Sequence, residues 1–274
     1  MAPGPAVTRG SISGIIVGMR AVILAGGQGT RLAEETETRP KPMVDIGGRP
    51  ILWHIMKHYA RHGVTEFVIA LGYRADDIKR FFVDYLSLNG DMTVELGNRA
   101  VQRHEPERDA WTVHLVDTGL DTNTGGRVGR LRRWLSDEPF FLTYGDGVSD
   151  VDLGRLVETH RSSGKLVTVT AVRPPSRFGG LSLESGGSAQ FIEKPQIGEG
   201  WINGGFMLVE PKVLDYIPCD ETSFESDVLE RISSEGRLGA YCHEGFWQSM
   251  DTLRDVRYLR GLWATNAAPW VTWR

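Results

Sequence analysis

Residues 20–32 read RAVILAGGQGTRL, a short apolar run that ends in three closely spaced glycines. Residues 39–43 (RPKPM) follow, and they place Lys41 between two prolines. Glycine lets a backbone approach a phosphate closely, and successive N–H groups in such a turn form an anion-binding concavity. With Arg31 and Lys41 as cations nearby, this layout predicts a strand edge that binds the polyphosphate of a nucleoside triphosphate.

Two common phosphate loops are excluded by the residues that follow the glycines. A Walker A loop needs Lys-Ser or Lys-Thr directly after its last glycine, but Gly29 is followed by Thr30 and Arg31. A dinucleotide fingerprint needs a glycine where this chain has Leu32. The glycines alone are also compatible with a tight turn that binds nothing. The two cations favour the phosphate site.

Bulk composition narrows the class of protein. The 274 residues are 41% hydrophobic and 24% charged, as in ordinary globular proteins. A net charge of −4 argues against a nucleic-acid surface, and no apolar run approaches the ~18 residues of a membrane span. The chain has two cysteines, which gives no disulfide framework and favours a reducing, cytoplasmic location. Residues 1–18, rich in Gly, Pro and Ser, are expected to form a flexible N-terminal extension.

Strand-like and helix-like segments alternate along the remainder. We expect strands at 20–25, 66–71, 92–96, 111–116, 140–144 and 166–172, and helices at 50–62, 76–86, 126–135 and 152–161. Shorter strands follow at 180–183, 190–193 and 206–209, with helices at 226–234 and 251–263. This order predicts an α/β fold with a Rossmann-like, mixed and mostly parallel sheet flanked by helices on both faces, and a C-terminal decoration of short strands and helices. We expect residues 19–274 to form a single domain, with halves of about 19–150 and 151–274.

Two aspartates are candidate metal ligands. Parallel sheets bind ligands outside the carboxyl ends of their strands, where both the glycine loop and Asp146 fall. Asp146 lies between two glycines after an expected strand, and Mg²⁺ is usually held by one or two carboxylates together with phosphate oxygens. Asp251 is the second candidate, although its position just before a helix also suits an N-cap, which spacing alone favours.

Two further segments carry polar groups beside turns. Glu193 and Lys194 end a short strand and could bind hydroxyls and a phosphate, but an isolated Glu-Lys-Pro is more often an exposed turn. Residues 201–206 (WINGGF) offer Asn203 and two glycines, or simply a β-bulge.

Histidines and tryptophans admit two interpretations each. His54, His58 and His62 follow a four-residue spacing that permits a metal site, but no acidic residue or cysteine in that helix completes it, so core and surface roles are the default. The C-terminal tryptophans could close a core or form an oligomer contact: Trp263, Trp270 and Trp273.

Taken in order, the motifs resemble those of the sugar-1-phosphate nucleotidyltransferases. The resemblance rests on AVILAGGQGTRL, RPKPM, YGDG, FIEKP, INGGF and FWQSMDTLRD, and it covers residues 19–274. Within that family, PILWHIMKHYARHG, TGGR, LTYGDGVSD and RFGGL are most similar to the branch that transfers a cytidylyl group to glucose 1-phosphate. The resemblance therefore implies CTP and glucose 1-phosphate as substrates, Mg²⁺ as cofactor, and a homo-oligomer, with a hexamer as one form.

The resemblance also implies roles for individual residues. The nucleotide is expected to contact Leu24, Gly26, Gly27, Gly29, Thr30, Arg31, Lys41, Arg127 and Asp146. The sugar phosphate is expected to contact Gly179, Glu193, Lys194 and Asn203. Asp146 and Asp251 are expected to hold the metal, and Arg31, Lys41 and Lys194 to carry catalysis. Arg127 is the candidate for recognition of cytosine, because a guanidinium can donate to the O2 acceptor of that base.

One alternative stays open, and a second is disfavoured. A related enzyme could use dTTP or UTP, or another phosphorylated acceptor. A regulatory subunit that had lost catalysis should lack a metal or phosphate residue, whereas this chain retains all of them. The implied reaction is an in-line attack by the sugar phosphate on the α-phosphorus, with release of pyrophosphate.

Overall fold

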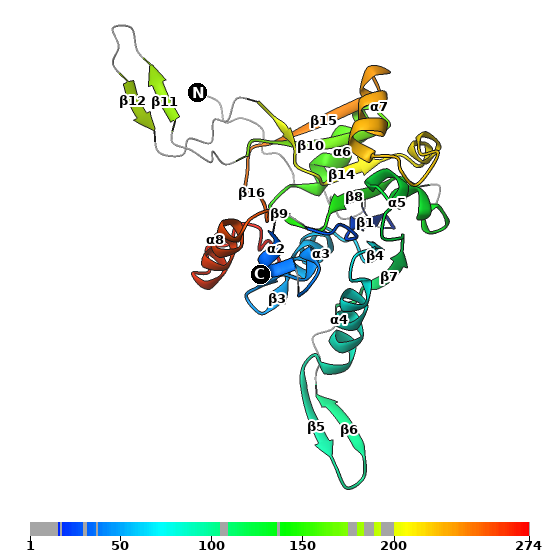
Figure 1. Cartoon of the computed structure of the whole chain (residues 1–274), viewed down its shortest axis with the longest axis vertical. Coiled ribbons are helices and arrows are strands. Elements are labelled where there is room, and N and C mark those ends of the chain that lie inside the picture. Colours follow the sequence, from blue (N-terminus) through cyan, green and yellow to red (C-terminus); the bar gives the residue numbers. More distant parts are fainter. Residues whose placement is uncertain are drawn as a thin grey trace, which may run out of the picture.

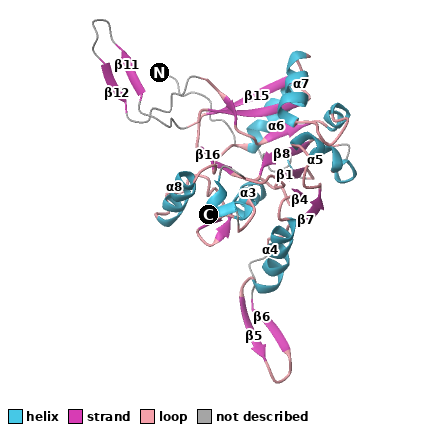
Figure 2. Cartoon of the chain, viewed as in Figure 1, coloured by secondary structure: helices cyan, strands magenta, loops and turns pink. Residues whose placement is uncertain are grey.

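The computed structural model describes residues 16, 18–29, 32–36, 38–104, 109–135, 138–174, 180–183, 189–192 and 200–273. In these parts of the chain, an eight-stranded sheet forms the centre of the molecule (Figures 1 and 2). Its strands are β1 (Arg20–Leu24), β4 (Glu66–Leu71), β7 (Thr112–Asp117), β8 (Phe140–Tyr144), β10 (Val167–Val172), β13 (Ile202–Asn203), β14 (Met207–Val209) and β15 (Leu238–His243).

The strand order is β13-β10-β14-β8-β1-β4-β7, and β15 pairs with β10. β1 pairs in parallel with both β4 and β8, β4 with β7, and β10 with β15, whereas β14 is antiparallel to its neighbours. The predicted mixed, mostly parallel α/β sheet is therefore confirmed. β1 lies inside the sheet, and its residues Ala21–Leu24 are buried in the cores on the two faces, which explains their continuous apolar sequence.

Helices cover both faces of the sheet. One hydrophobic core takes Ala21 and Ile23 from β1 and lies against α3 (Ile51–Arg61), α6 (Leu153–Ser163) and α8 (Leu253–Ala264). The other core takes Val22 and Leu24 and lies against α5 (Thr124–Arg130), the 3₁₀ segment η4 (Pro211–Tyr216), the π-helix η5 (Phe224–Leu229) and α7 (Glu230–Ser234). The alternation of side chains along the strand divides them between the two layers.

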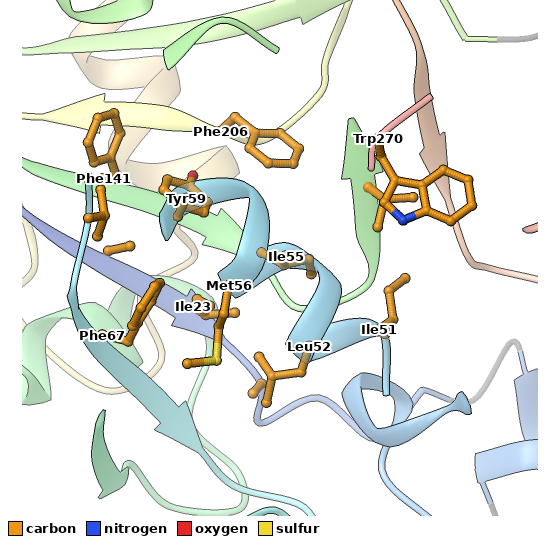
Figure 3. Close-up of a cluster of buried hydrophobic side chains, with 14 of the residues drawn as sticks. Ile23, Ile51, Leu52, Ile55, Met56, Tyr59, Phe67, Phe141, Phe206 and Trp270 are labelled. Atoms are coloured by element: carbon orange, nitrogen blue, oxygen red, sulfur yellow. The ribbon is translucent and has the colours of Figure 1, made fainter. Parts of the chain in front are cut away.

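Helix α3 shows how the sequence builds the larger core (Figure 3). Its apolar residues recur with helical spacing, and they pack against the sheet: Ile51, Leu52, Ile55, Met56 and Tyr59. The Tyr59 ring stacks on Phe206 at a centroid distance of 5.9 Å. His54 is fully buried, with Nε2 2.8 Å from the Ile46 carbonyl oxygen and Nδ1 accepting from the Trp270 indole, so it acts as a core residue.

The C-terminal tryptophans close this core, as one of their two interpretations predicted. Trp270 is 0% exposed and stacks on Phe246, while Trp263 and Trp273 lie edge-on or tilted against His54. Within the described residues there is no group of three or more His, Cys, Asp or Glu arranged to hold a metal, so the histidine metal site is not formed there.

The described part of the chain contains further elements. They are α2 (Ala33–Thr36), the 3₁₀ segments η2 (Lys41–Met43) and η3 (Arg132–Trp134), α4 (Ala75–Leu88), and the two-stranded pairs β2 (Asp45–Ile46) with β3 (Arg49–Pro50), β5 (Asp91–Glu95) with β6 (Ala100–His104), β9 (Gly147–Ser149) with β16 (Trp247–Ser249), and β11 (Gly180–Leu183) with β12 (Ala189–Ile192). α4 and the β5–β6 hairpin form an arm that projects from the body (Figure 1).

Several boundaries differ from the sequence-based expectation. The helix predicted at 126–135 begins at Thr124, ends at Arg130 and continues as η3, and the helix predicted at 226–234 begins as a π-helix at Phe224. The strands that were not predicted are β2, β3, β6, β9, β13, β15 and β16. Ile16, assigned to the flexible extension, is 1% exposed and belongs to the larger core. No helix in the described part of the chain is long and apolar enough to cross a membrane.

Candidate active site

The glycine loop leaves β1 at the carboxyl edge of the sheet. The Ala25 N–H donates to the Ala70 carbonyl, so the loop begins beside the end of β4. Gly29 has a φ of +64°, and a Cβ atom there would lie 2.9 Å from Thr36 Cγ2. The Thr36 hydroxyl donates to the Gly29 carbonyl at 3.1 Å. The turn thus requires glycine both for its left-handed backbone and for its contact with α2.

Arg127 supports this loop through hydrogen bonds, and these bonds correct the role in cytosine recognition that was expected for it. Its side chain is 4% exposed, and its two terminal nitrogens donate to five oxygens of the protein: those of Gly26, Leu71, Thr118, Gly119 and Leu120. A guanidinium used in this way has no terminal nitrogen left for the O2 atom of cytosine. The structure therefore shows Arg127 as a support of the loop, because a buried cation needs its N–H groups satisfied.

Lys41 lies between the two predicted metal ligands. Its Nζ atom is 2.5 Å from Asp146 Oδ2 and 2.8 Å from Asp251 Oδ1. Lys41 opens η2 behind Pro40, and Asp146 follows β8. Asp251 lies between β16 and α8, where the Met250 N–H donates to the Asp146 carbonyl at 2.8 Å. Three distant segments thus bring one cation and two carboxylates to one point.

The N-cap interpretation of Asp251 is wrong. Thr252 caps α8, and its hydroxyl accepts from the Asp255 N–H while the Asp255 carboxylate accepts from the Thr252 N–H, which is a capping box. The Asp255 carboxylate also accepts from the Asp251 N–H at 3.0 Å. The Asp251 side chain is thereby left to point at Lys41 instead of at its own helix.

The electrostatics of the cluster favour the charged lysine. Burial is the largest single influence and would lower the pKa of Lys41, but the charges and hydrogen bonds of Asp146 and Asp251 together outweigh it, so the pKa is raised. Lys41 is therefore a cation at neutral pH. It partly offsets the mutual repulsion of the two carboxylates.

These groups line a cavity of about 470 Å³ at the carboxyl edge of the sheet. All predicted nucleotide residues within the described chain are among its walls: Leu24, Gly26, Gly27, Gly29, Lys41, Arg127 and Asp146. Asp251 is there as well. The cavity volume is in the range of small-molecule sites, and the carboxyl ends of the neighbouring strands β1 and β8 both contribute to its wall.

Sequence reasoning missed part of the wall. Thr122, Asn123 and Tyr144 also line the cavity. Tyr144 directly precedes Gly145 and Asp146 at the end of β8, which is a position that could have pointed to it. Thr122 and Asn123 precede the TGGR segment, and Asn123 is the residue before the first turn of α5. Their place in the cavity depends on how α5 packs, which local sequence does not state.

The remaining predicted residues are placed differently. Thr30, Arg31, Gly179, Glu193 and Lys194 lie outside the described residues. Asn203 lies on β13, paired with Ala171, and its Oδ1 accepts from the Gly205 N–H at 3.0 Å. Asn203 is not part of the cavity wall described above.

The donor set fits a magnesium ion. Asp146 Oδ2 and Asp251 Oδ1 converge on the same ammonium group, so a small cation between them would meet two hard oxygen ligands. Mg²⁺ commonly takes one or two carboxylates and completes its shell with water and phosphate oxygens. The cavity beside the pair has room for those groups.

Comparison with known proteins identifies the class. The model of the nucleotidyl transferase family matches residues 20–257, and the chain belongs to that family. A glucose-1-phosphate cytidylyltransferase of Salmonella typhi is 48% identical over 256 residues, which cover 93% of this chain and 100% of the relative. A probable glucose-1-phosphate cytidylyltransferase of Bacillus subtilis is 41% identical over 257 residues, which cover 93% of this chain and 100% of the relative.

Solved structures agree on the fold. The crystal structure of HddC from Yersinia pseudotuberculosis superposes with a TM-score of 0.66 at 24% identity, covering 89% of this chain and 99% of the other. A UDP-glucose pyrophosphorylase complexed with UDP-glucose gives a TM-score of 0.63 at 16% identity, covering 90% and 99%. These structures show that the fold is the same, and the family match and the relatives above show that the protein is a nucleotidyltransferase enzyme.

Proposed function

We propose that the protein transfers a cytidylyl group from CTP to α-D-glucose 1-phosphate, forming CDP-glucose and pyrophosphate. One observation carries the proposal. A lysine and two aspartates meet at the wall of a cavity bounded by a glycine loop, in a chain that is 48% identical to a glucose-1-phosphate cytidylyltransferase along that relative's whole length. The loop supplies N–H groups for phosphates, and the aspartates supply hard oxygen ligands.

The proposed mechanism needs no general base. An oxygen of the sugar phosphate, already an anion at neutral pH, attacks the α-phosphorus, and the bond to the β-phosphate oxygen breaks as pyrophosphate leaves. Lys41 donates to phosphate oxygens and offsets the charge that accumulates there. Arg31 and Lys194 are assigned the same kind of role on the nucleotide and the sugar phosphate, with Glu193 accepting from sugar hydroxyls. Gly179 and Asn203 complete the proposed sugar site.

Magnesium is part of the proposal. Asp146 and Asp251 would hold the ion. When bound, Mg²⁺ supplies charge neutralisation for the phosphate oxygens of the two substrates. The residues then act by positioning: the glycine loop orients the triphosphate, and Lys41 keeps the phosphates beside the carboxylate pair.

A substrate panel tests the proposal. Pyrophosphate release is measured with CTP, UTP, dTTP and GTP, each against glucose 1-phosphate and mannose 1-phosphate. GTP and mannose 1-phosphate belong in the panel because a probable mannose-1-phosphate guanylyltransferase of rice is 35% identical over 249 residues, covering 89% of this chain and 64% of that protein. We expect the highest kcat/KM for CTP with glucose 1-phosphate. A higher value for any other pair overturns the assignment.

We also propose that the protein is a homo-oligomer and that the arm is a contact between copies. Large apolar side chains are exposed along it: Val83 (62%), Leu86 (75%), Leu88 (62%), Val94 (51%), Leu96 (85%) and Val101 (59%). Within the described chain, β5 and β6 pair only with each other, so both outer edges of the hairpin are open. An isolated two-stranded hairpin is marginally stable in water, and open apolar edges pair readily. A second copy would cover them, and a hexamer is one closed form.

The proposed location is the cytoplasm. Cys219 and Cys242 are both free and exposed, which suits a reducing compartment.

A further inference from the structure

Glu225 is hydrogen-bonded to two residues of the cavity wall, Tyr144 and Thr124, without lining the cavity itself. Its carboxylate accepts from the Tyr144 hydroxyl at 2.6 Å through Oε1, and from the Thr124 hydroxyl at 2.6 Å through Oε2. The Ser223 hydroxyl adds a third bond to Oε2 at 3.2 Å. Tyr144 and Thr124 both line the cavity, whereas Glu225 is not among its lining residues. One carboxylate therefore connects the end of β8 with the first turn of α5.

The segment that carries Glu225 is held tightly against α5. The Thr222 carbonyl accepts from the Gly126 N–H at 3.1 Å, and the Phe224 N–H donates to the Thr124 hydroxyl at 2.9 Å. A Cβ atom on Gly125 would lie 2.7 Å from the Thr222 carbonyl oxygen, so this close approach requires glycine. The contact places Glu225 in the first turn of the π-helix η5. Such irregular helices occur often at functional sites.

This arrangement fixes the direction of two hydroxyl groups. An ionised carboxylate only accepts hydrogen bonds, so the hydroxyl protons of Tyr144 and Thr124 must point at Glu225. Tyr144 then presents lone pairs, and no proton, to a bound substrate.

We propose that Glu225 is a positioning residue for the transfer reaction: by holding Thr124 and Tyr144 together, it keeps the α5 wall and the β8 wall of the cavity in register. The proposal rests on the proposed nucleotidyl transfer. Glu225 acts through the two hydroxyls and is not itself placed against the reacting atoms. Removal of the Glu225 carboxylate is therefore expected to lower kcat/KM for both substrates.

A double-mutant cycle tests this role. Glu225→Gln, Tyr144→Phe and the double variant are compared with the parent by pyrophosphate release, using whichever substrate pair the parent turns over fastest. We expect Glu225→Gln to lower kcat/KM by about 10- to 100-fold, as for other hydrogen bonds to a charged group. In the Tyr144→Phe background, Glu225→Gln should lower kcat/KM much less, because the hydroxyl that bonds Glu225 Oε1 is already absent.

A matched control is Glu230→Gln, which removes the same charge from an exposed side chain at the start of α7. The Glu230 backbone N–H donates to the Glu225 carbonyl, and the substitution leaves that backbone group in place. It should leave kcat/KM unchanged. Glu225→Asp keeps the charge but shortens the reach by one methylene, and it should lose activity as Glu225→Gln does. If Glu225→Gln fails to fold, Glu225→Asp replaces it in the comparison.

Three outcomes overturn the proposal: parent-like kcat/KM in Glu225→Asp or Glu225→Gln, an equal loss in Glu230→Gln, or losses from Glu225→Gln and Tyr144→Phe that simply multiply. The choice of the parent's own best substrate pair separates this test from the substrate assignment. If CTP with glucose 1-phosphate is not that pair, the proposed substrates fail, while the role of Glu225 is still decided by the cycle.

Discussion

At the scale of single residues, Lys41 stands between two carboxylates that would otherwise repel each other. Nζ contacts Asp146 Oδ2 at 2.5 Å and Asp251 Oδ1 at 2.8 Å. Replacing Lys41 by Met keeps most of the stem volume but removes the charge. We expect kcat to fall by about 10²- to 10³-fold, as for the loss of one preorganised donor in other enzymes. The kcat of Asp146→Asn should fall by a similar factor.

Steady-state kinetics check this prediction, with circular dichroism to confirm that both variants stay folded. Lys212→Met is the control, because Lys212 is exposed and distant in sequence from the cavity residues. A kcat near the parental value in either Lys41→Met or Asp146→Asn would remove the assigned role.

Lys41 also competes for the carboxylates that would hold the metal. In the protein without substrates, its ammonium occupies the position between Asp146 and Asp251 where a divalent cation would bind. Removing it should therefore tighten the binding of Mn²⁺ to the nucleotide-free protein, since two carboxylates lose their counter-ion. Electron paramagnetic resonance titration measures the free Mn²⁺. The double variant Lys41→Met, Asp146→Asn should not show this tighter Mn²⁺ binding. Weaker Mn²⁺ binding in Lys41→Met alone would contradict the prediction.

Gly26 is constrained by Arg127. A Cβ atom on Gly26 would lie 2.3 Å from Arg127 Nη1, whereas one on Gly27 would meet nothing within 4 Å. Gly26→Ala must displace a guanidinium that supports the loop, and overpacking of this kind costs about 1–3 kcal/mol. We expect lower unfolding free energy and weaker nucleotide binding in Gly26→Ala. Urea unfolding should show Gly27→Ala within about 0.5 kcal/mol of the parent. Equal losses in the two variants would argue against the support role.

At the scale of elements, helix α3 carries a buried titratable group. His58 is 2% exposed, and burial first, then the positive charge of His62, lowers its pKa from 6.5 to about 3. Asp150 and His243 also face it, with opposite effects. In the unfolded chain His58 therefore binds a proton near pH 6.5, whereas in the folded chain it does so only near pH 3. Stability must fall as pH drops through this window.

We expect His58 to contribute up to ~1.4 kcal/mol of lost unfolding free energy per pH unit below 6.5. Urea unfolding at pH 7, 6 and 5 measures the slope. His58→Leu should flatten it, whereas His104→Leu, a change at an exposed position on the arm, is the control. The His62 pKa is lowered in the same direction, chiefly by burial, and this keeps part of the slope in the variant. An unchanged slope in His58→Leu would contradict the prediction.

Elements with strong local signals were predictable. β1 and β8 are mostly apolar, β10 (VTVTAV) is rich in β-branched residues, and α3 has helical periodicity bounded by Pro50 and Gly63. β15 was not predicted, because its burial alternates irregularly and its partner β10 lies about 70 residues away in the chain. α8 begins at Leu253 because of a capping box, so a start predicted at Asp251 was two residues early.

At the scale of the whole molecule, the arm predicts association. If it joins copies of the chain, charges placed on its apolar surface should separate them, because each would be buried without a partner. We expect Leu86→Glu combined with Leu96→Glu to reduce the molecular mass measured by size-exclusion chromatography with light scattering. Tyr258→Glu, at a 49% exposed position on α8, should not. A parental mass that is already that of one chain would rule out the oligomer.

The candidate site also belongs to this scale. Lys41, Asp146 and Asp251 are separated by 105 residues or more, and their convergence depends on the pairing of β1 with β8 and of β9 with β16. The sequence marked each of these residues through its neighbours. It did not show that Lys41 lies between the two carboxylates, because that distance is set by the packing of three segments.

The sequence by itself determined the apolar strands, the helical periodicities, and a set of motifs whose order and spacing indicated a nucleotidyltransferase, because these depend on neighbouring residues. Tertiary structure alone decided that the Arg127 guanidinium supports the glycine loop, that Asp251 points at Lys41 and leaves the cap to Thr252, and that Glu225 joins Thr124 to Tyr144. The reason is physical. A polar side chain turns toward whatever unsatisfied partner packing brings within about 3 Å, and that partner can lie a hundred residues away.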